Sequence, residues 1–270
     1  MIELSLLIPS RDEELLEKTI EDVLLHTESH TEVLVGLDGW SQPINDEDLY
    51  LAQFKYKGKV HFIKSVKGIG QRAMTNALAK ASKAKYLMKI DAHTSFQQGF
   101  DKQMMSEMDN RTILAPLMGV LEPVSWTING NKMRSHYGFD TNLVMQYLPN
   151  GEGDTPCLQG SAFMIERENY WKWGLDDESL GSWGQQGVQL GILAYLNGGR
   201  CRTTTEAYFG HLFRHTDAEF PYNRGPEPGK FANEEMKHRH LNQSIAGLIR
   251  KFNYFCDWTP EAVKALPDVL

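Results

Sequence analysis

Two side chains that can bind metal, Asp91 and His93, follow an apolar segment at residues 85–90. Alternate residues of a β-strand lie on the same side, so this carboxylate and this imidazole are expected to face the same way where the strand ends. Oxygen and imidazole ligands together hold divalent cations, and such cations neutralise phosphate oxygens. The pair therefore predicts a metal site that positions a phosphate-bearing substrate.

The first third of the chain alternates between short apolar runs, typical of buried strands, and the 3.6-residue spacing of helices. The predicted elements are strand 3–8, helix 12–26, strand 31–37, strand 59–64, helix 70–83 and strand 85–90. This alternation indicates an α/β fold with a mostly parallel sheet that helices cover on both faces. Ligands of such sheets bind beyond the carboxyl ends of the strands, where Asp38, Arg72 and Asp91 are expected.

Past residue 110 the pattern is less regular. The predicted elements are strand 112–117, a hairpin within 125–147, strand 157–166, helix 187–196, strand 202–209 and helix 233–252. Residues 217–231 are rich in proline, glycine and aromatics, which favours a lid that closes over a substrate and excludes water. We expect one domain over residues 1–270: a nucleotide-binding half (1–110), a sugar and acceptor half (111–235), and a C-terminal helix and tail (236–270).

The composition is that of an ordinary globular protein, and the formal net charge of -7 gives no indication of a nucleic-acid-binding surface. The three cysteines, Cys157, Cys201 and Cys256, lack paired spacing, which argues against a disulfide framework or a structural zinc site. The apolar run at residues 1–9 is too short and too acidic for a signal peptide. No apolar run approaches the roughly 20 residues of a membrane span. We therefore expect a cytoplasmic location.

Six segments of the chain follow the order found in one enzyme family. They are residues 6–13 (LLIPSRDE), 32–41 (EVLVGLDGWS), 91–93 (DAH), 181–186 (GSWGQQ), 210–214 (GHLFR) and the pair 220–222 (FPY) and 231–233 (FAN). Together they resemble the family-2-like glycosyltransferases of the GT-A fold, most of all the polypeptide N-acetylgalactosaminyltransferase branch. The resemblance implies a GT-A (nucleotide-diphospho-sugar transferase) fold with a Rossmann-like, mixed, mostly parallel sheet flanked by helices. It also implies metal-dependent transfer of a sugar from a UDP-sugar. Mixed oxygen and imidazole ligands favour Mn²⁺ over Mg²⁺ as the divalent metal, with zinc as an alternative.

The resemblance assigns the contacts to metal and phosphate. Asp91, His93 and His211 become the metal ligands, in the Asp-x-His form of a motif that is more often Asp-x-Asp. Arg214 and the hydroxyl group of Tyr222 would pair with the phosphates. The competing interpretation makes Asp91 a cap at the strand end, His93 an ordinary loop residue, Arg214 a surface cation and Tyr222 a packing residue.

Five further residues are assigned around the nucleotide and the sugar. Asp38 would accept a hydrogen bond from the uracil or the ribose, and Arg72 would face the base or the phosphate. Pro9 and Arg11 would line the same end of the sheet. Asp38 is also suited to a turn with the glycine that follows it, and Arg72 to a solvated helix face. Trp183 would stack on the sugar or the acceptor, or else it is a core aromatic residue.

Gln186 departs from the family pattern. The related enzymes have a glutamate in this segment, and inverting members have their catalytic base there, but a glutamine cannot remove a proton. Asp176, Asp177 and Glu178 lie nearby in the sequence, so a displaced base is one option. The other is a retaining transfer in which the leaving phosphate takes the proton of the acceptor, and we favour it. Trp183, Gln186 and Arg214 are then the residues assigned to catalysis.

Two other functions fit parts of the pattern. A nucleotidyltransferase of similar fold would bind a nucleoside triphosphate, but it predicts a basic, glycine-rich loop after the first strand, where residues 9–13 contain no glycine. A non-catalytic nucleotide-sugar-binding module is suggested by the missing carboxylate at Gln186. The acceptor of a transferase is left open among a glycan, a protein hydroxyl, a lipid-linked sugar and a modified nucleobase in DNA. The DNA option rests on the mildly basic stretch 211–251 and is a minority one.

Overall fold

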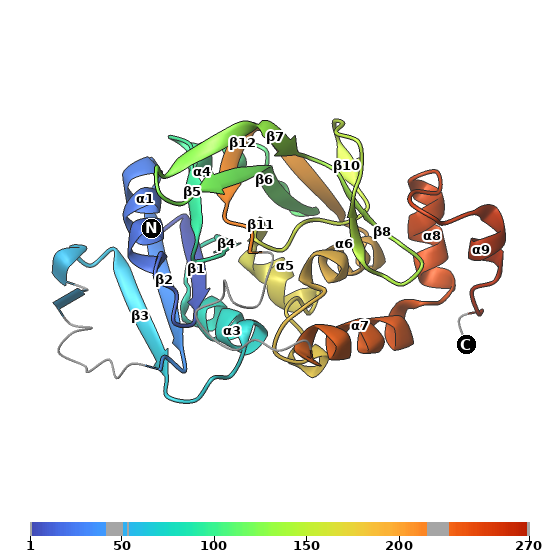
Figure 1. Ribbon diagram of the computed structural model, residues 1–270, viewed down its shortest axis with the longest axis horizontal. Helices are drawn as coiled ribbons and strands as arrows, with labels where there is room; N and C mark the ends of the chain where they lie inside the picture. The colour runs from blue at the N-terminus through green and yellow to red at the C-terminus, as the bar shows by residue number, and fades with distance from the viewer. Residues whose placement is uncertain (1, 42–50, 53, 215–226, 269–270) are drawn as a thin grey trace.

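The computed structural model describes residues 2–41, 51–52, 54–214 and 227–268 (Figure 1). Ten strands of this part form one mixed sheet in the order β10-β12-β6-β11-β4-β1-β2-β3, with β5 beside β12 and β7 beside β6. Helices flank the sheet, and the C-terminal helices α8 and α9 lie at the opposite end of the long axis from β3 (Figure 1). The mixed, helix-flanked sheet that the sequence predicted is confirmed.

The N-terminal part contains the parallel section of the sheet. Its elements are β1 (Leu4–Ser10), α1 (Leu16–His26), β2 (Thr31–Asp38), β3 (Val60–Ser65), α3 (Gln71–Ala81) and β4 (Tyr86–Ile90). β1 pairs in parallel with β2 and β4, and β2 pairs in parallel with β3. The predicted elements are present, but α1 begins four residues later than predicted, after a turn in which Asp12 has a positive φ of 48°.

Antiparallel pairs predominate in the rest of the sheet. The elements are β5 (Thr94–Phe96), α4 (Phe100–Ser106), β6 (Thr112–Glu122), β7 (Thr127–Arg134), β8 (Tyr137–Phe139), β9 (Met145–Tyr147), β10 (Asp154–Thr155), β11 (Ala162–Glu166), α5 (Arg167–Lys172), the 3₁₀ turn η1 (Glu178–Leu180), α6 (Gln186–Leu196) and β12 (Arg200–His211). The predicted hairpin is present as β8 and β9. The predicted strand 157–166 is wrong in its first half, because Gln159 Oε1 accepts a hydrogen bond from the backbone N–H of Ser161 and holds a turn there.

Three helices end the described chain: α7 (Glu227–His240), α8 (Gln243–Lys251) and α9 (Pro260–Lys264). The single helix predicted over 233–252 is wrong, since Asn242 ends the first helical segment and caps α8 by accepting from Ser244 N–H. The loop predicted over 217–231 is wrong for residues 227–231, which form the first turns of α7, and the role of the segment as a lid stays a prediction. The remainder of that segment, with Tyr222, lies outside the described residues.

Two hydrophobic cores cover the two faces of the sheet. Leu6 of β1 packs in the same core as Ile20 of α1, whereas its neighbour Leu7 packs with Met74 and Leu78 of α3. Because alternate residues of a strand face opposite sides, a strand buried on both faces reads as a continuous apolar run. Among the helices described, none has the length and apolar character that a membrane crossing needs.

Candidate active site

Three metal-capable side chains meet at the carboxyl end of the sheet. Asp91 and His93 follow β4, and His211 is the last residue of β12, on the far side of β11 and β6. One ligand atom from each lies within 4.8 Å of the others. Asp91 Oδ2 is 3.1 Å from His211 Nε2 and 4.0 Å from His93 Nε2. The structure thus brings together the three residues assigned as metal ligands, although they are up to 120 positions apart.

The charge states of this cluster suit a divalent cation. Burial alone would raise the pKa of Asp91, but Lys89 and then His211 outweigh it and hold the pKa well below its usual range. Burial lowers the pKa of His211 against the opposing effect of the hydrogen bond to Asp91. The cluster therefore offers one anionic oxygen and a neutral imidazole nitrogen. Such a mixed oxygen and nitrogen donor set fits a metal of the Mn²⁺ or Zn²⁺ type.

Glu13 supports the cluster, and sequence reasoning gave it no role. Its side chain is buried, with Oε2 at 2.9 Å from His93 Nδ1 and Oε1 accepting a hydrogen bond from Arg214 Nη2 at 2.8 Å. Burial acts to raise the pKa of Glu13, but the hydrogen bonds and charges of His93 and Arg214 outweigh it and lower the pKa to about 2. A carboxylate at Nδ1 favours the tautomer that leaves Nε2 for a metal.

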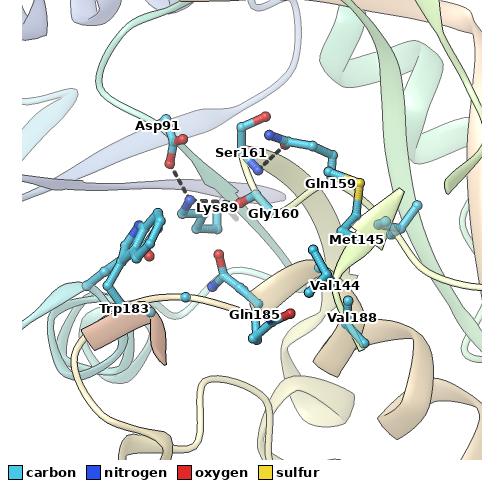
Figure 2. Close-up of a pocket in the computed structure, with 16 residues that line it drawn as sticks. Lys89, Asp91, Val144, Met145, Gln159, Gly160, Ser161, Trp183, Gln185 and Val188 are labelled. Atoms are coloured by element: carbon cyan, nitrogen blue, oxygen red, sulfur yellow. Dashed lines mark hydrogen bonds and ion pairs between the residues drawn. The ribbon is translucent and has the colours of Figure 1, made fainter. Parts of the chain in front are cut away.

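Lys89 is a second supporting residue that sequence reasoning missed. It lies two positions before Asp91 on β4 and is only 1% exposed. Its Nζ contacts Asp91 Oδ1 and donates to the carbonyl oxygen of Gly160 at 2.8 Å (Figure 2). The available signal was a lysine inside an apolar strand, spaced so that it shares a face with Asp91.

Two adjoining depressions lie beside the cluster. The small cleft, of about 110 Å³, is lined by Pro9, Ser10, Arg11, Glu13, Asp38, Gln71, Asp91, Ala92, His93, Trp183 and Arg214. The large pocket, of about 380 Å³, is lined by Gln71, Lys89, Asp91, Val144, Met145, Leu158, Gln159, Gly160, Ser161, Trp183, Gly184, Gln185, Gln186, Gly187, Val188 and Gly229. Gln71, Asp91 and Trp183 border both spaces, so the two lie next to each other.

Trp183 separates the two spaces. It is 39% exposed, so the interpretation as a core aromatic residue is wrong. In Figure 2 its ring stands on one side of the large pocket, across from Val144, Met145 and Val188. An accessible indole face at the rim of a pocket is suited to stacking on a sugar ring, and this role for Trp183 stays a prediction.

Asp38 and Arg72 act mainly within the protein. Asp38 accepts hydrogen bonds from the N–H groups of Ile69 at 2.6 Å and Gly70 at 2.9 Å, so its carboxylate holds the turn before α3. It still lines the small cleft, and its contact with a base or ribose stays a prediction.

Arg72 is 1% exposed, so a solvated helix face is wrong. Its guanidinium does not line either space but donates to the carbonyl oxygens of Gly181 and Gly184, on either side of Trp183. The expectation that Arg72 faces the base or phosphate is therefore corrected: it positions the loop that carries Trp183. Gly70 shows how closely this loop packs on α3, since a Cβ at Gly70 would lie 2.4 Å from that of Ser182.

Gln186 lines the large pocket, and a carboxylate lies behind it. Its Nε2 donates to Asp176 Oδ1, and Asp176 is 2% exposed and absent from the pocket lining. Asp177 pairs with Arg239, and Glu178 accepts a hydrogen bond from Asn76. None of the three acidic residues that the sequence offered as a displaced base therefore reaches the pocket lining.

Comparison with known proteins identifies the class of this fold and then the family. A crystal structure titled GalNAc-T7 with UDP, GalNAc and Mn²⁺ superposes with a TM-score of 0.78 at 17% identity, over 92% of this chain and 50% of that chain. A structure of S. aureus TarS gives a TM-score of 0.55 at 13% identity, over 95% of this chain and 44% of that one. The fold is that of the GT-A glycosyltransferases. Residues 5–174 match the family Glycosyl transferase family 2, and the chain belongs to that family.

Curated relatives point to one branch of related enzymes. A putative polypeptide N-acetylgalactosaminyltransferase 13 of Drosophila melanogaster is 25% identical over 179 residues, which is 62% of this chain and 32% of that protein. Polypeptide N-acetylgalactosaminyltransferase 13 of Homo sapiens is 24% identical over 163 residues, 54% of this chain and 29% of that protein. This chain thus spans about a third of the length of these relatives. The resemblance inferred from the six segments is confirmed.

Proposed function

We propose that this protein is a metal-dependent glycosyltransferase that moves a sugar from a UDP-sugar to an acceptor. The observation that carries the proposal is the convergence of Asp91, His93 and His211 between the small cleft and the large pocket. A solved structure of the same fold was obtained with UDP, GalNAc and Mn²⁺, which supports a uridine nucleotide and manganese here.

Different residues around the cluster would bind the different parts of a nucleotide sugar. Asp91, His93 and His211 would hold the metal, which supplies positive charge to the diphosphate as the sugar–phosphate bond breaks. Arg214 lies within 3.4 Å of His93 Nδ1 and lines the small cleft, where a guanidinium can bind phosphate oxygens. Glu13 holds both Arg214 and His93 in place. The large pocket then receives the sugar, with Trp183 beside it.

We favour transfer with retention of configuration at the sugar. Among the described residues that line the large pocket, Asp91 is the only carboxylate, and it is the residue assigned to the metal. An inverting reaction needs a base that can take the acceptor proton. With no carboxylate at Gln186, the leaving phosphate is the group that can accept this proton.

The acceptor, the location and the internal division of the chain stay proposals. A glycan, a protein hydroxyl or a lipid-linked sugar is favoured as the acceptor over a modified nucleobase in DNA. A cytoplasmic location and a division at residue 110 into nucleotide-binding and sugar-binding halves remain predictions. Family membership argues against the nucleotidyltransferase alternative.

Two measurements test the proposal. The first is calorimetric titration of UDP into the protein, once in a buffer that contains Mn²⁺ and once in a buffer that contains EDTA. The second is the release of UDP from a panel of UDP-hexoses. We expect UDP to bind with Mn²⁺ and to lose most of its affinity in EDTA, and we expect slow metal-dependent hydrolysis of at least one UDP-hexose. Equal UDP binding in both buffers would overturn the metal-dependent assignment. Metal-dependent binding with no release of UDP under any condition would favour the non-catalytic module.

A further inference from the structure

A third cavity, of about 370 Å³, lies where β6 and β12 begin and where α6 and α8 end. Its lining carries three cations, Arg111, Arg200 and Lys251, and two carboxylates, Asp109 and Asp154. Arg200 is the first residue of β12, so the cavity is at the opposite end of this strand from the metal cluster. Within the described part of the chain, it shares no lining residue with the small cleft or the large pocket.

The two carboxylates of this cavity do not balance its three cations. Both oxygens of Asp109 are used within the protein, since Oδ1 accepts from a backbone N–H and a hydroxyl at the start of β6 and Oδ2 accepts from Arg200 Nη2. Asp154 lies 4.0 Å from Arg200 Nε and 3.6 Å from Lys251 Nζ, and both distances are too long for a hydrogen bond. The lining thus has three positive charges against two negative ones, in a chain whose formal net charge is -7.

Hydrogen-bond donors are left over around the cavity. Arg111 directs Nε and Nη2 to the carbonyl oxygen of Gly198, at 3.3 Å and 3.2 Å, and Arg200 directs its Nε and Nη2 to the start of β6 and the turn before it. Among the residues that the structure describes, Nη1 of both guanidinium groups, Nζ of Lys251 and the hydroxyl of Tyr195 have no hydrogen-bond partner. These groups are suited to a ligand with several acceptor oxygens.

We propose that this cavity binds a phosphate group through Arg111, Arg200 and Lys251, with Asp154 competing for the last two. A phosphate group offers more oxygens than the two of a carboxylate, and guanidinium groups bind it by paired hydrogen bonds. A free phosphate ion and an organic phosphate ester share this chemistry. The volume is more than ten times the roughly 30 Å³ that a water molecule takes in the liquid, so the organic part of an ester also has room.

The test is a titration of the protein with inorganic phosphate, in EDTA at constant pH and ionic strength, followed by NMR. The backbone N–H resonances of residues 198–200 should shift with a Kd of about 1 mM, a value within reach of so small a ligand. Acetate, with two oxygens and one charge, should bind there at least about tenfold more weakly. Phosphate-dependent shifts confined to the residues of the small cleft would overturn the inference, as would equal binding of acetate and phosphate at residues 198–200.

Two matched ion pairs supply the variants. Lys251 with Asp154 lines the cavity at 3.6 Å, and Lys102 with Glu28 lies outside it at 3.7 Å. Lys251→Gln should raise the Kd for phosphate about tenfold, because a charged donor is lost. Asp154→Asn should lower the Kd about threefold to tenfold, because the competing negative charge is removed. Lys102→Gln and Glu28→Gln should leave the Kd unchanged.

The Asp154→Asn variant keeps the test decisive, since damage to the fold cannot make phosphate bind more tightly. A Kd that neither Asp154→Asn nor Lys251→Gln changes would overturn the inference.

Glucose 6-phosphate separates the two sources of the phosphate group. Tighter binding than that of inorganic phosphate supports a site for an organic phosphate, and weaker binding supports a site for the free ion. Absence of shifts at residues 198–200 with both probes would overturn the inference. These titrations contain neither UDP nor Mn²⁺, so their outcome and that of the proposed function are independent.

Discussion

The small cleft and the large pocket differ in how their polar groups are held. In the small cleft, charged groups pair with one another: Glu13 contacts both His93 and Arg214. The wall of the large pocket is mostly apolar or carries amides, and of its charged pair, Lys89 with Asp91, only Asp91 also lines the cleft. Charges held in a fixed network are suited to a diphosphate and a metal, whereas oriented amides are suited to the hydroxyl groups of a sugar.

The largest effect is expected from a change at Asp91, which borders both the small cleft and the large pocket. Asp91→Asn removes the only anionic ligand of the cluster, so metal-dependent turnover of a UDP-sugar should fall by about 1000-fold or more in kcat/KM. Steady-state kinetics over a Mn²⁺ series measures this loss. Asp268→Asn, at an exposed carboxylate near the C-terminus, is the control for charge. Retained turnover in a folded Asp91→Asn protein would remove the metal site from the mechanism.

Glu13 tests whether the network of the small cleft acts on the metal. Glu13→Gln should raise the Mn²⁺ concentration needed for half-maximal UDP binding by about 10–100-fold, because His93 loses the carboxylate that orients it. The neighbouring, exposed Glu14 gives a matched control as Glu14→Gln. A lower unfolding temperature with an unchanged Mn²⁺ requirement would show that Glu13 only stabilises the fold.

Arg72 tests the support of the wall between the two spaces. Arg72→Met leaves the half-buried carbonyls of Gly181 and Gly184 without their charged donor, which should lower the free energy of unfolding by about 3 kcal/mol. Displacement of Trp183 should then weaken UDP-sugar binding several-fold, more than UDP binding. Lys80→Met, at an exposed position of the same helix, should change neither quantity. Equal loss of UDP and UDP-sugar affinity would contradict a specific effect on the large pocket.

The smallest expected effect is on the pH dependence of stability, where neighbouring carboxylates should behave oppositely. Burial raises the pKa of Asp176, so its contribution to stability is present below the unfolded pKa and is lost as pH rises through the folded value. The pKa of Asp177 is lowered: its burial is outweighed by hydrogen bonds from Ser179 and by Arg239. Its contribution is present above the unfolded pKa and is lost as pH falls.

Urea unfolding at several pH values should therefore show Asp176→Asn gaining stability relative to the original protein as pH rises from 4 to 7. Asp177→Asn should lose relative stability over the same interval. Parallel trends for the two variants would show that the burial of Asp176 does not control its protonation.

Most of the sheet could be predicted from the sequence, since residues 4–8 and 86–90 are mostly apolar runs of the length of a buried strand. The pair Asp91 and His93 could be predicted as a candidate metal site because it follows the end of a strand, whereas His211 was assigned from the family resemblance. Glu13 was missed because nothing local distinguishes it from its neighbour Glu14. The break between α7 and α8 was missed because the helical pattern continues across Asn242, and the capping hydrogen bond to Ser244 interrupts it only in three dimensions.

The sequence by itself determined which chemistry is available: the order of strands and helices, the Asp-x-His pair at the end of β4, and the glutamine where a carboxylate was expected. Only the tertiary structure decided which of these polar side chains face a ligand and which face other parts of the protein. Arg72 turns inward to carbonyl groups, and Asp176 is buried behind the amide of Gln186. The physical reason is that buried polar groups must be satisfied by partners that lie far away along the chain.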